Sequence, residues 1–173
     1  AVSDAVKGVY ASVFYRDSKA YMTATSNLID QEKMAVVLQE VVGVRFNDRL
    51  YPLISGVARS LNFYPIGKEK AEDGIVNIAL GLGKYIVDGG VTLRFSPRHP
   101  RNILQMSTTE FALRETQTHF LALDMKNMPI RFSVDDSFNL MRLGVKDADE
   151  DGALKFISST YEPHDHIIRD GYY

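Results

Sequence analysis

The chain has 173 residues, of which 45% are hydrophobic and 24% charged, and this composition excludes a largely disordered protein. It contains no cysteine, which excludes disulfides and thiolate metal sites and fits a reducing compartment such as the cytoplasm. The formal net charge is −2 and no long run of one sign occurs, so nucleic acid and anionic membranes are poor candidate partners.

Two further exclusions follow from the apolar residues. The longest uninterrupted apolar run, residues 34–38, is far shorter than the roughly 20 residues that span a bilayer. No basic start followed by an apolar stretch resembles a signal peptide. Because the chain begins at Ala1 without methionine and shows helical spacing by about Asp4, we expect it to be a fragment of a longer protein.

The first predicted element is a helix over about residues 4–22. Val6, Tyr10, Phe14 and Tyr21 are among the apolar residues that recur there at helical spacing. Ser3 or Asp4 could cap its first turn.

Strands are predicted next. Residues 34–42 are rich in branched side chains and end at Gly43, which predicts a buried strand with Gln39 and Glu40 as its polar exceptions. Residues 54–60 and 75–79 predict two more strands. Short strands at this spacing favour an antiparallel or mixed sheet.

The second half of the chain alternates turns with short elements. One helical turn is predicted over residues 84–88 and a strand near 91–95. Ser107 and Glu110 have the spacing of a capping box, which predicts a helix over about 108–123. Residues 130–168 alternate apolar and polar side chains, which predicts about three short strands.

An acidic segment resembles the first half of a calcium loop. Asp147, Asp149 and Asp151 occupy alternate positions before Gly152. The closing position is Ser158 instead of a glutamate, and the flanking residues alternate as in strands. We therefore predict a hairpin turn with solvated aspartates in place of a calcium site.

Two histidines and the serines carry weaker signals. His164 and His166 lie two residues apart and could begin a metal site, but two ligands do not make one, so a surface or strand-end role is predicted. No G-x-S-x-G motif supports a hydrolase triad.

Gly81 and Gly83 lie at a predicted strand-to-helix junction, where backbone amides can bind phosphate. The segment lacks the full spacing of a dinucleotide fold and of a P-loop, so the local pattern favours a plain tight turn. Asn77, in the strand before it, is either a metal-facing amide or an edge residue.

Taken in order, four segments resemble the ATP-binding domain of phosphoenolpyruvate synthase and pyruvate phosphate dikinase: residues 11–21, 36–42, 54–58 and 77–89. Their order and spacing carry the resemblance, which covers about residues 8–96.

This resemblance implies an ATP-grasp fold, in the α+β class, with a mostly antiparallel sheet and packed helices. It also implies that residues 1–173 form a single domain, the second half of the nucleotide-binding domain, with the other enzyme domains absent. The implied activity is a cytoplasmic phosphotransferase that uses ATP and Mg²⁺. It passes a phosphoryl group to a histidine on a separate domain of the same polypeptide and then to pyruvate, so the fragment alone is expected to be inactive. A related hypothesis within the same class is an antibiotic phosphotransferase with the same ATP-grasp half.

The resemblance assigns the adenine and ribose contacts to one short segment. It implies that Gln39, Glu40, Val41 and Val42 form the hinge strand that holds both groups. An extended backbone offers a donor and an acceptor for the purine edge, and the valines would supply apolar contacts.

The resemblance assigns the phosphate end to four residues. It implies that Asn77 is an oxygen ligand of Mg²⁺ and that Gly81 and Gly83 allow close backbone approach. It makes Arg94 the group that neutralises charge on the leaving phosphate, since phosphoryl transfer depends mainly on positioning and electrostatics. Lys84 departs from the acidic residue that the family usually has after the glycines.

The alternative interpretation is a non-catalytic binding or scaffolding module. It would keep the fold and use the acidic segment, residues 147–151, for calcium or a protein partner. Lys84 favours this alternative.

Overall fold

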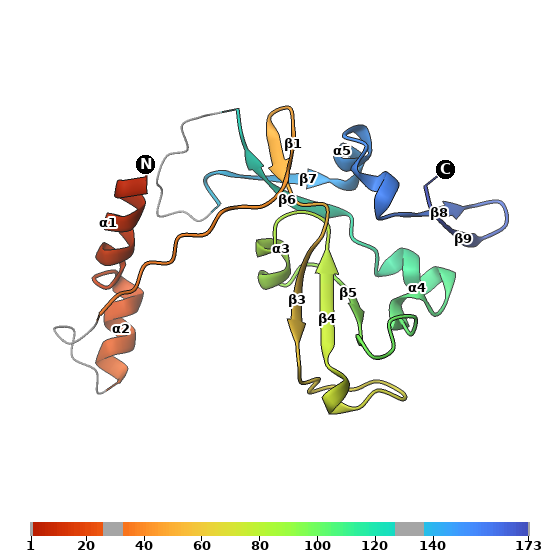
Figure 1. Cartoon of the computed structure of the whole chain (residues 1–173), viewed down its shortest axis with the longest axis horizontal. Coiled ribbons are helices and arrows are strands. Elements are labelled where there is room, and N and C mark those ends of the chain that lie inside the picture. Colours follow the sequence, from red (N-terminus) through yellow and green to blue (C-terminus); the bar gives the residue numbers. More distant parts are fainter. Residues whose placement is uncertain (1, 26–32, 127–136, 173) are drawn as a thin grey trace. The chain divides into compact units, whose positions relative to one another are not determined.

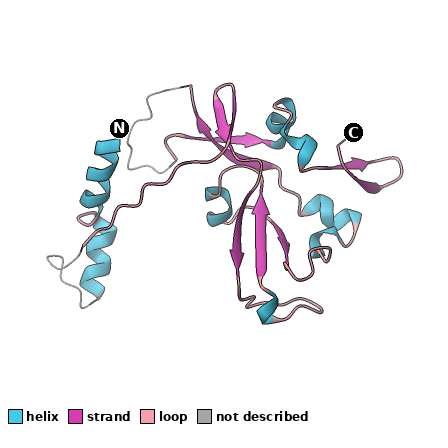
Figure 2. Cartoon of the chain, in the orientation of Figure 1, coloured by secondary structure: helices cyan, strands magenta, loops and turns pink. Residues whose placement is uncertain are grey.

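The computed structural model describes residues 2–25, 33–126 and 137–172, and these form two compact units (Figure 1). The first unit combines residues 1–41 with 125–139, and the second combines residues 42–124 with 140–173. The fold class is α+β with antiparallel sheets and a few helices, which confirms that prediction (Figure 2).

The first unit contains two helices, α1 (Val2–Ser12) and α2 (Arg16–Ala24). The prediction of helix over residues 4–22 is confirmed for most positions, but a single helix is wrong. The chain turns at residues 13–15, and Tyr15 has an extended backbone with ψ 157°. At this break the Ser12 and Ser18 hydroxyls donate to the carbonyls of Val9 and Ser12, and such side-chain bonds to the backbone compete with helix continuation.

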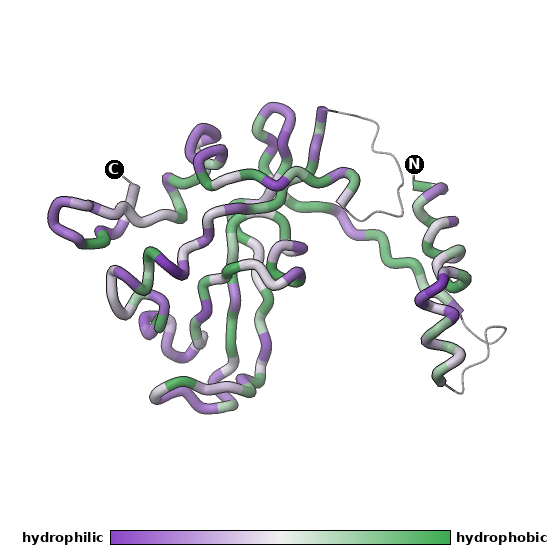
Figure 3. Tube along the Cα trace, turned by 180° about the vertical axis from the view of Figure 1, so that it is seen from behind, coloured by the Kyte–Doolittle hydropathy of each residue, from purple (hydrophilic) through white to green (hydrophobic). Residues whose placement is uncertain are grey.

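The predicted strand over residues 34–42 is wrong. Residues 33–43 have no regular secondary structure, and most of their side chains are exposed, Val37 by 81% and Leu38 by 73%. Figure 3 shows the hydrophobic colour along this segment. A strand needs a neighbour to pair with its backbone, and among the described residues the first strand pairing begins at Val44. Branched apolar residues do not form a strand where no partner strand lies beside them.

The second unit is built on a four-stranded antiparallel sheet with the order β1-β2-β6-β7. Its strands are β1 (Val44–Phe46), β2 (Arg49–Tyr51), β6 (His119–Asp124) and β7 (Leu140–Gly144).

A three-stranded antiparallel sheet follows, with the order β3-β4-β5. Its strands are β3 (Ser55–Arg59), β4 (Ile75–Ala79) and β5 (Leu93–Phe95), and all three are confirmed predictions. A hairpin of β8 (Ser159–Glu162) and β9 (Ile167–Asp170) lies near the C-terminus. With β7, it supplies the short strands expected in the last third; residues 130–136 of that prediction lie outside the described residues.

The helices of the second unit are short. They are the 3₁₀ turns η2 (Ala71–Asp73), η3 (Leu104–Met106) and η4 (Ala153–Phe156), and the α-helices α3 (Lys84–Val87), α4 (Thr109–Arg114) and α5 (Val145–Glu150). The one-turn helix predicted at 84–88 is confirmed.

The helix predicted over residues 108–123 is correct only in its first half. α4 ends at Arg114, and residues 119–124 form the strand β6, in which Phe120 and Ala122 are fully buried. This period of two matches a strand paired on both sides, with β2 and β7. Thr108, and not Ser107, caps the helix, because its hydroxyl accepts a hydrogen bond from the Phe111 amide.

The predicted hairpin turn at the acidic segment is also wrong. Residues 145–150 form α5, and Gly152 follows it with a left-handed backbone, φ 73°. Gly152 therefore acts as a helix C-terminal glycine.

The core of the second unit lies between the four-stranded sheet and the α5–η4 segment. Tyr51 and Phe120 are fully buried, with ring centroids 4.7 Å apart. Ala148 of α5 and Ala153 of η4 belong to the same cluster. Small side chains on these two helical turns allow close approach to the sheet.

Candidate functional site

The three-stranded sheet brings two of the predicted site residues together. Asn77 lies in the middle of β4, directly opposite Arg94 of β5 and Val57 of β3. Residues opposite each other in antiparallel strands project to the same face, so Asn77 and Arg94 share one face of this sheet. The Asn77 Oδ1 atom accepts a hydrogen bond from the Thr92 hydroxyl at 3.3 Å. The sequence analysis did not single out Thr92.

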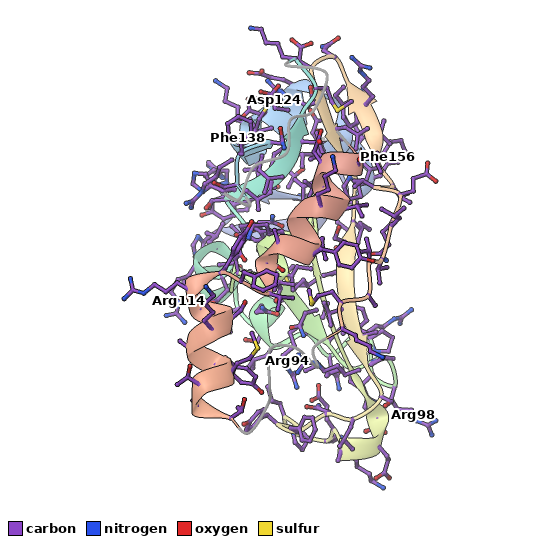
Figure 4. All side chains as sticks on the ribbon, turned by 90° about the vertical axis from the view of Figure 1, so that its left-hand side faces the viewer. Arg94, Arg98, Arg114, Asp124, Phe138 and Phe156 are labelled. Carbon is purple, nitrogen blue, oxygen red and sulfur yellow. The ribbon has the colours of Figure 1, made fainter. Side chains whose placement is uncertain are left out.

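The Arg94 guanidinium is held by an acidic partner. Its Nη2 lies 2.9 Å and its Nη1 3.3 Å from the two carboxylate oxygens of Glu69, and Nη2 also donates to the Tyr64 carbonyl at 3.1 Å. Figure 4 shows Arg94 on its ribbon. The Glu69 side chain is only 4% exposed, and its bond to Arg94 holds the pKa of this carboxyl below the usual value. The positive charge predicted to meet phosphate is thus neutralised within the chain, and the catalytic role of Arg94 stays a prediction.

Glu69 and Asn62 are residues that the sequence analysis missed. Both fall in a polar connection between two strands, and nothing in the local pattern separates them from their exposed neighbours. Residue 62 is only 1% exposed, and the Asn62 side chain donates a hydrogen bond to the Glu69 carboxylate at 2.9 Å. Only the tertiary structure shows that this connection contributes a buried carboxylate that pairs with Arg94 of β5.

Gly81 is required for packing. Its backbone φ is +87°, and a Cβ atom at this position would lie 2.7 Å from the Leu121 carbonyl oxygen of β6. The Gly81 amide donates to the Pro52 carbonyl at 3.2 Å, and the Leu82 amide donates to Leu121 at 2.8 Å. These two amides are therefore used inside the fold, and a contact between Gly81 and phosphate stays a prediction.

Gly83 has a more open environment. It is the N-terminal cap of α3, and the nearest atom to a Cβ built there is the Ser55 Cβ at 3.8 Å. The next residue, Lys84, forms an ion pair with Asp88 at 3.0 Å. The positive charge of Lys84, where the family usually has an acidic residue, is therefore paired with the Asp88 carboxylate one helical turn later.

The predicted adenine-binding segment is exposed. Gln39, Glu40 and Val41 belong to the first unit, and Val42 begins the second. Val41 is 49% and Val42 77% exposed. Their assignment to adenine and ribose stays a prediction.

One concave region borders the three-stranded sheet. It is a cavity of about 540 Å³ whose walls include Ile78, Leu93 and Leu113. Because successive residues of a strand point to opposite faces, Ile78 and Leu93 face away from Asn77 and Arg94. Its described walls contain neither lysine nor arginine, so they offer no cation to a triphosphate.

The acidic segment is part of the fold. The Arg49 side chain contacts Asp147 at 3.2 Å and Asp151 at 3.3 Å, and the Tyr51 hydroxyl donates to Asp151 at 2.8 Å. Burial and this bond raise the pKa of Tyr51. The prediction of solvated aspartates is wrong for Asp147 and Asp151, since both are partners of β2.

The two histidines of the C-terminal hairpin lie at the surface, as predicted. His164 has a side chain that is 96% exposed, and His166 contacts Glu110 at 3.0 Å and the Tyr161 hydroxyl at 2.8 Å. Residues 2–25, 33–126 and 137–172 contain no group of three or more acidic or histidine side chains that could hold a metal ion.

The AMP/ATP-binding domain model of pyruvate phosphate dikinase matches residues 1–127. The chain belongs to this family. The match confirms the resemblance drawn from the sequence and extends it beyond residue 96. Comparisons with curated proteins and with solved structures gave no match. Nucleotide binding, with AMP or ATP as the ligand, is thus the property of the family domain, and the family is one of phosphotransferases.

The residues around Asn77 do not by themselves fit the Mg²⁺ that the family resemblance implied. Mg²⁺ is usually bound through carboxylates and water. The Asn77 oxygen already accepts from Thr92, and the residue opposite is the cation Arg94. Asn77 as a magnesium ligand stays a prediction.

The helices of the structure can be compared with the length and apolar character of a membrane span. Among the residues that the structure describes, no helix combines the length and the apolar character needed to cross a bilayer.

Proposed function

We propose that this chain is the second half of an ATP-grasp nucleotide-binding domain in a cytoplasmic phosphotransferase that resembles phosphoenolpyruvate synthase and pyruvate phosphate dikinase. In this proposal the enzyme transfers a phosphoryl group from ATP to a histidine on another domain of the same polypeptide, and from there to pyruvate. The single observation that supports it most is the match of residues 1–127 to the family's AMP/ATP-binding domain.

The proposed nucleotide site uses the face of the sheet that carries Asn77 and Arg94. Asn77 is aligned with Arg94 in register, and the glycine turn lies directly beyond the end of β4. Gly83 leaves room for a phosphate to approach the backbone there, whereas the Gly81 amide is already bonded to Pro52. Arg94 can neutralise charge on the phosphates only if its guanidinium leaves the Glu69 carboxylate and binds the nucleotide.

The family resemblance supports the proposal that the segment Gln39–Val42 contacts adenine and ribose. Its backbone pairs with no strand among the described residues, so its amides and carbonyls form no sheet hydrogen bonds there. An extended segment of this kind can form two hydrogen bonds with the edge of a purine, one from a backbone amide and one to a backbone carbonyl. Glu40 would then lie next to the ribose.

The test measures phosphohistidine formation from ATP in the full-length protein that contains this chain. We expect Glu40→Ala and Asn77→Ala each to lower the rate by about tenfold or more, as expected for lost contacts to a reacting nucleotide. Glu72→Ala and Asn102→Ala are the matched controls, because both residues are exposed and lie outside the proposed site. Unchanged rates in both site variants would remove these residue assignments, and absence of ATP-dependent histidine phosphorylation would remove the proposed activity.

A further inference from the structure

The connection between β3 and η2 exposes an unusual set of large apolar side chains. We call residues 61–70 the aromatic loop. Phe63 is 66% and Tyr64 84% exposed, and they are flanked by Leu61 at 44% and Ile66 at 40%. Neighbouring exposed apolar residues of this size are uncommon on surfaces that contact only water, and they mark interaction sites.

This loop has a fixed conformation although it has almost no regular secondary structure. The buried Asn62 donates from its backbone to Ala71 at 2.8 Å, and its side-chain oxygen accepts from the Tyr64 amide at 3.0 Å. Glu69 accepts from the Ile66 amide at 3.0 Å. The aromatic side chains are therefore presented by a backbone that is already ordered, which lowers the entropy that binding would cost.

Arg94 connects the loop to the sheet. Its guanidinium reaches both the Glu69 carboxylate and the Tyr64 carbonyl, so one side chain of β5 holds the loop at two points. A partly buried ion pair contributes only modest net stability, because removing charge from water offsets much of the attraction between the two groups. Its clearest effect here is to fix the position of the exposed residues on either side of it.

The exposed charges around the loop are mostly positive. Arg59, Lys68, Lys70 and Arg98 are exposed, and Figure 4 shows Arg98 at the η2 end of the sheet. Glu72 is the exposed acid of this end, with a side chain that is 77% exposed and 4.0 Å from the Lys70 amine.

The two other acids at this end are already engaged. Glu69 is paired with Arg94, and Asp73 accepts from the Lys70 amide and lies 3.6 Å from His99. The apolar centre therefore has a cationic rim.

The loop is poorly suited to phosphate. The amides of Tyr64, Ile66, Glu69 and Lys70 all donate to acceptors within the loop and η2. Phosphate sites in proteins are usually built from free backbone amides. A phosphate would find these four amides already bonded, whereas an apolar surface would meet an ordered patch.

We infer that the aromatic loop is a docking surface for a protein partner whose contact area has an apolar centre and an acidic rim. Phe63 and Tyr64 are the central contacts, since aromatic residues contribute most to such interfaces. Arg59, Lys68 and Arg98 match the acidic rim, and Glu69 and Arg94 act as positioning residues. This inference does not depend on the proposed phosphotransferase activity.

The experiment selects short displayed peptides on the immobilised full chain, synthesises the consensus peptide, and measures its dissociation constant by fluorescence anisotropy. We expect the consensus to combine aromatic or leucine side chains with aspartate and glutamate, and its binding to weaken in high salt. Phe63→Ser and Tyr64→Ser should each raise the dissociation constant about tenfold or more. Phe156→Ser is the matched control, because Phe156 is 80% exposed on a different element. Both loop side chains are mainly exposed, so melting curves should show unchanged folding.

Several results would overturn this inference. They are a selection without enrichment, a consensus without acids, or binding that survives both loop substitutions. Sedimentation that shows wild-type self-association abolished by Tyr64→Ser would assign the loop to a second copy of the chain instead. Binding to phosphatidylserine vesicles that depends on Tyr64 would assign it to a membrane.

Discussion

Gly81 offers the sharpest test of the packing in the second unit. Replacement by alanine would place a methyl group 2.7 Å from the Leu121 carbonyl oxygen and 2.9 Å from Phe120. The carbonyl belongs to β6, which pairs with strands on both sides, so it cannot move away without disturbing the sheet. Crowding of this kind costs about 1–3 kcal/mol. The backbone φ of +87° adds about 1–2 kcal/mol for any residue with a side chain.

Gly89 separates these two contributions. Its φ is +82°, close to that of Gly81, but no atom lies within 4 Å of a Cβ built there. We therefore expect Gly89→Ala to lose only the backbone contribution, about 1–2 kcal/mol. The lower entropy of the unfolded alanine chain affects both variants alike and cancels in the comparison.

The measurement is guanidinium unfolding followed by circular dichroism, since the chain has no tryptophan. We expect the free energy of unfolding of Gly81→Ala to lie about 1–3 kcal/mol below that of Gly89→Ala. Equal losses in the two variants would refute the close approach of Gly81 to β6. A Gly81 variant with full stability but weaker ATP binding would instead support the phosphate role given by the family resemblance.

Three further predictions concern the hydrogen-bond networks. Because Arg94 lowers the pKa of Glu69, the stability from this pair is present above pH 4.5 and is lost as the pH falls through the lowered value; Glu69→Gln should flatten this dependence in acid unfolding curves. Tyr51→Phe should lower the free energy of unfolding by about 1.5–3 kcal/mol, because it removes the bond to the Asp151 carboxylate, and alkaline absorbance titration of the wild type should show one tyrosine that ionises only on unfolding. Thr108→Ala removes the cap of α4 and should lower the free energy of unfolding by about 1 kcal/mol in the same denaturant assay. Thr108→Ser keeps the hydroxyl and should leave this free energy unchanged.

The family and the three strands of the β3-β4-β5 sheet could be predicted from the sequence. β3, β4 and β5 are short runs bounded by glycine, proline and polar residues, so their local pattern and their tertiary role agree. The same is true of α3, where Gly83 and Gly89 bracket a single helical turn. The placement of Asn77 and Arg94 on one face follows from the pairing of two correctly predicted strands.

Other elements are decided by contacts that the local sequence does not contain. Residues 119–124 are a strand because β2 and β7 lie on either side of them, which overrides the helical start at Thr108. Residues 145–150 are helical because this places Asp147 and Asp151 beside Arg49, about a hundred positions earlier in the chain. Residues 34–42 have the composition of a strand but no described partner.

The sequence by itself determined the family, the α+β class and the positions where local turn chemistry and apolar period coincide. Only the tertiary structure decided that Gly81 packs against β6, that Arg94 is paired with a buried Glu69, and that the connection between β3 and η2 is an ordered aromatic loop. The physical reason is distance along the chain. Periodicity reports which face of a segment prefers burial, whereas the identity of the group that meets it is fixed only when segments remote in sequence come together.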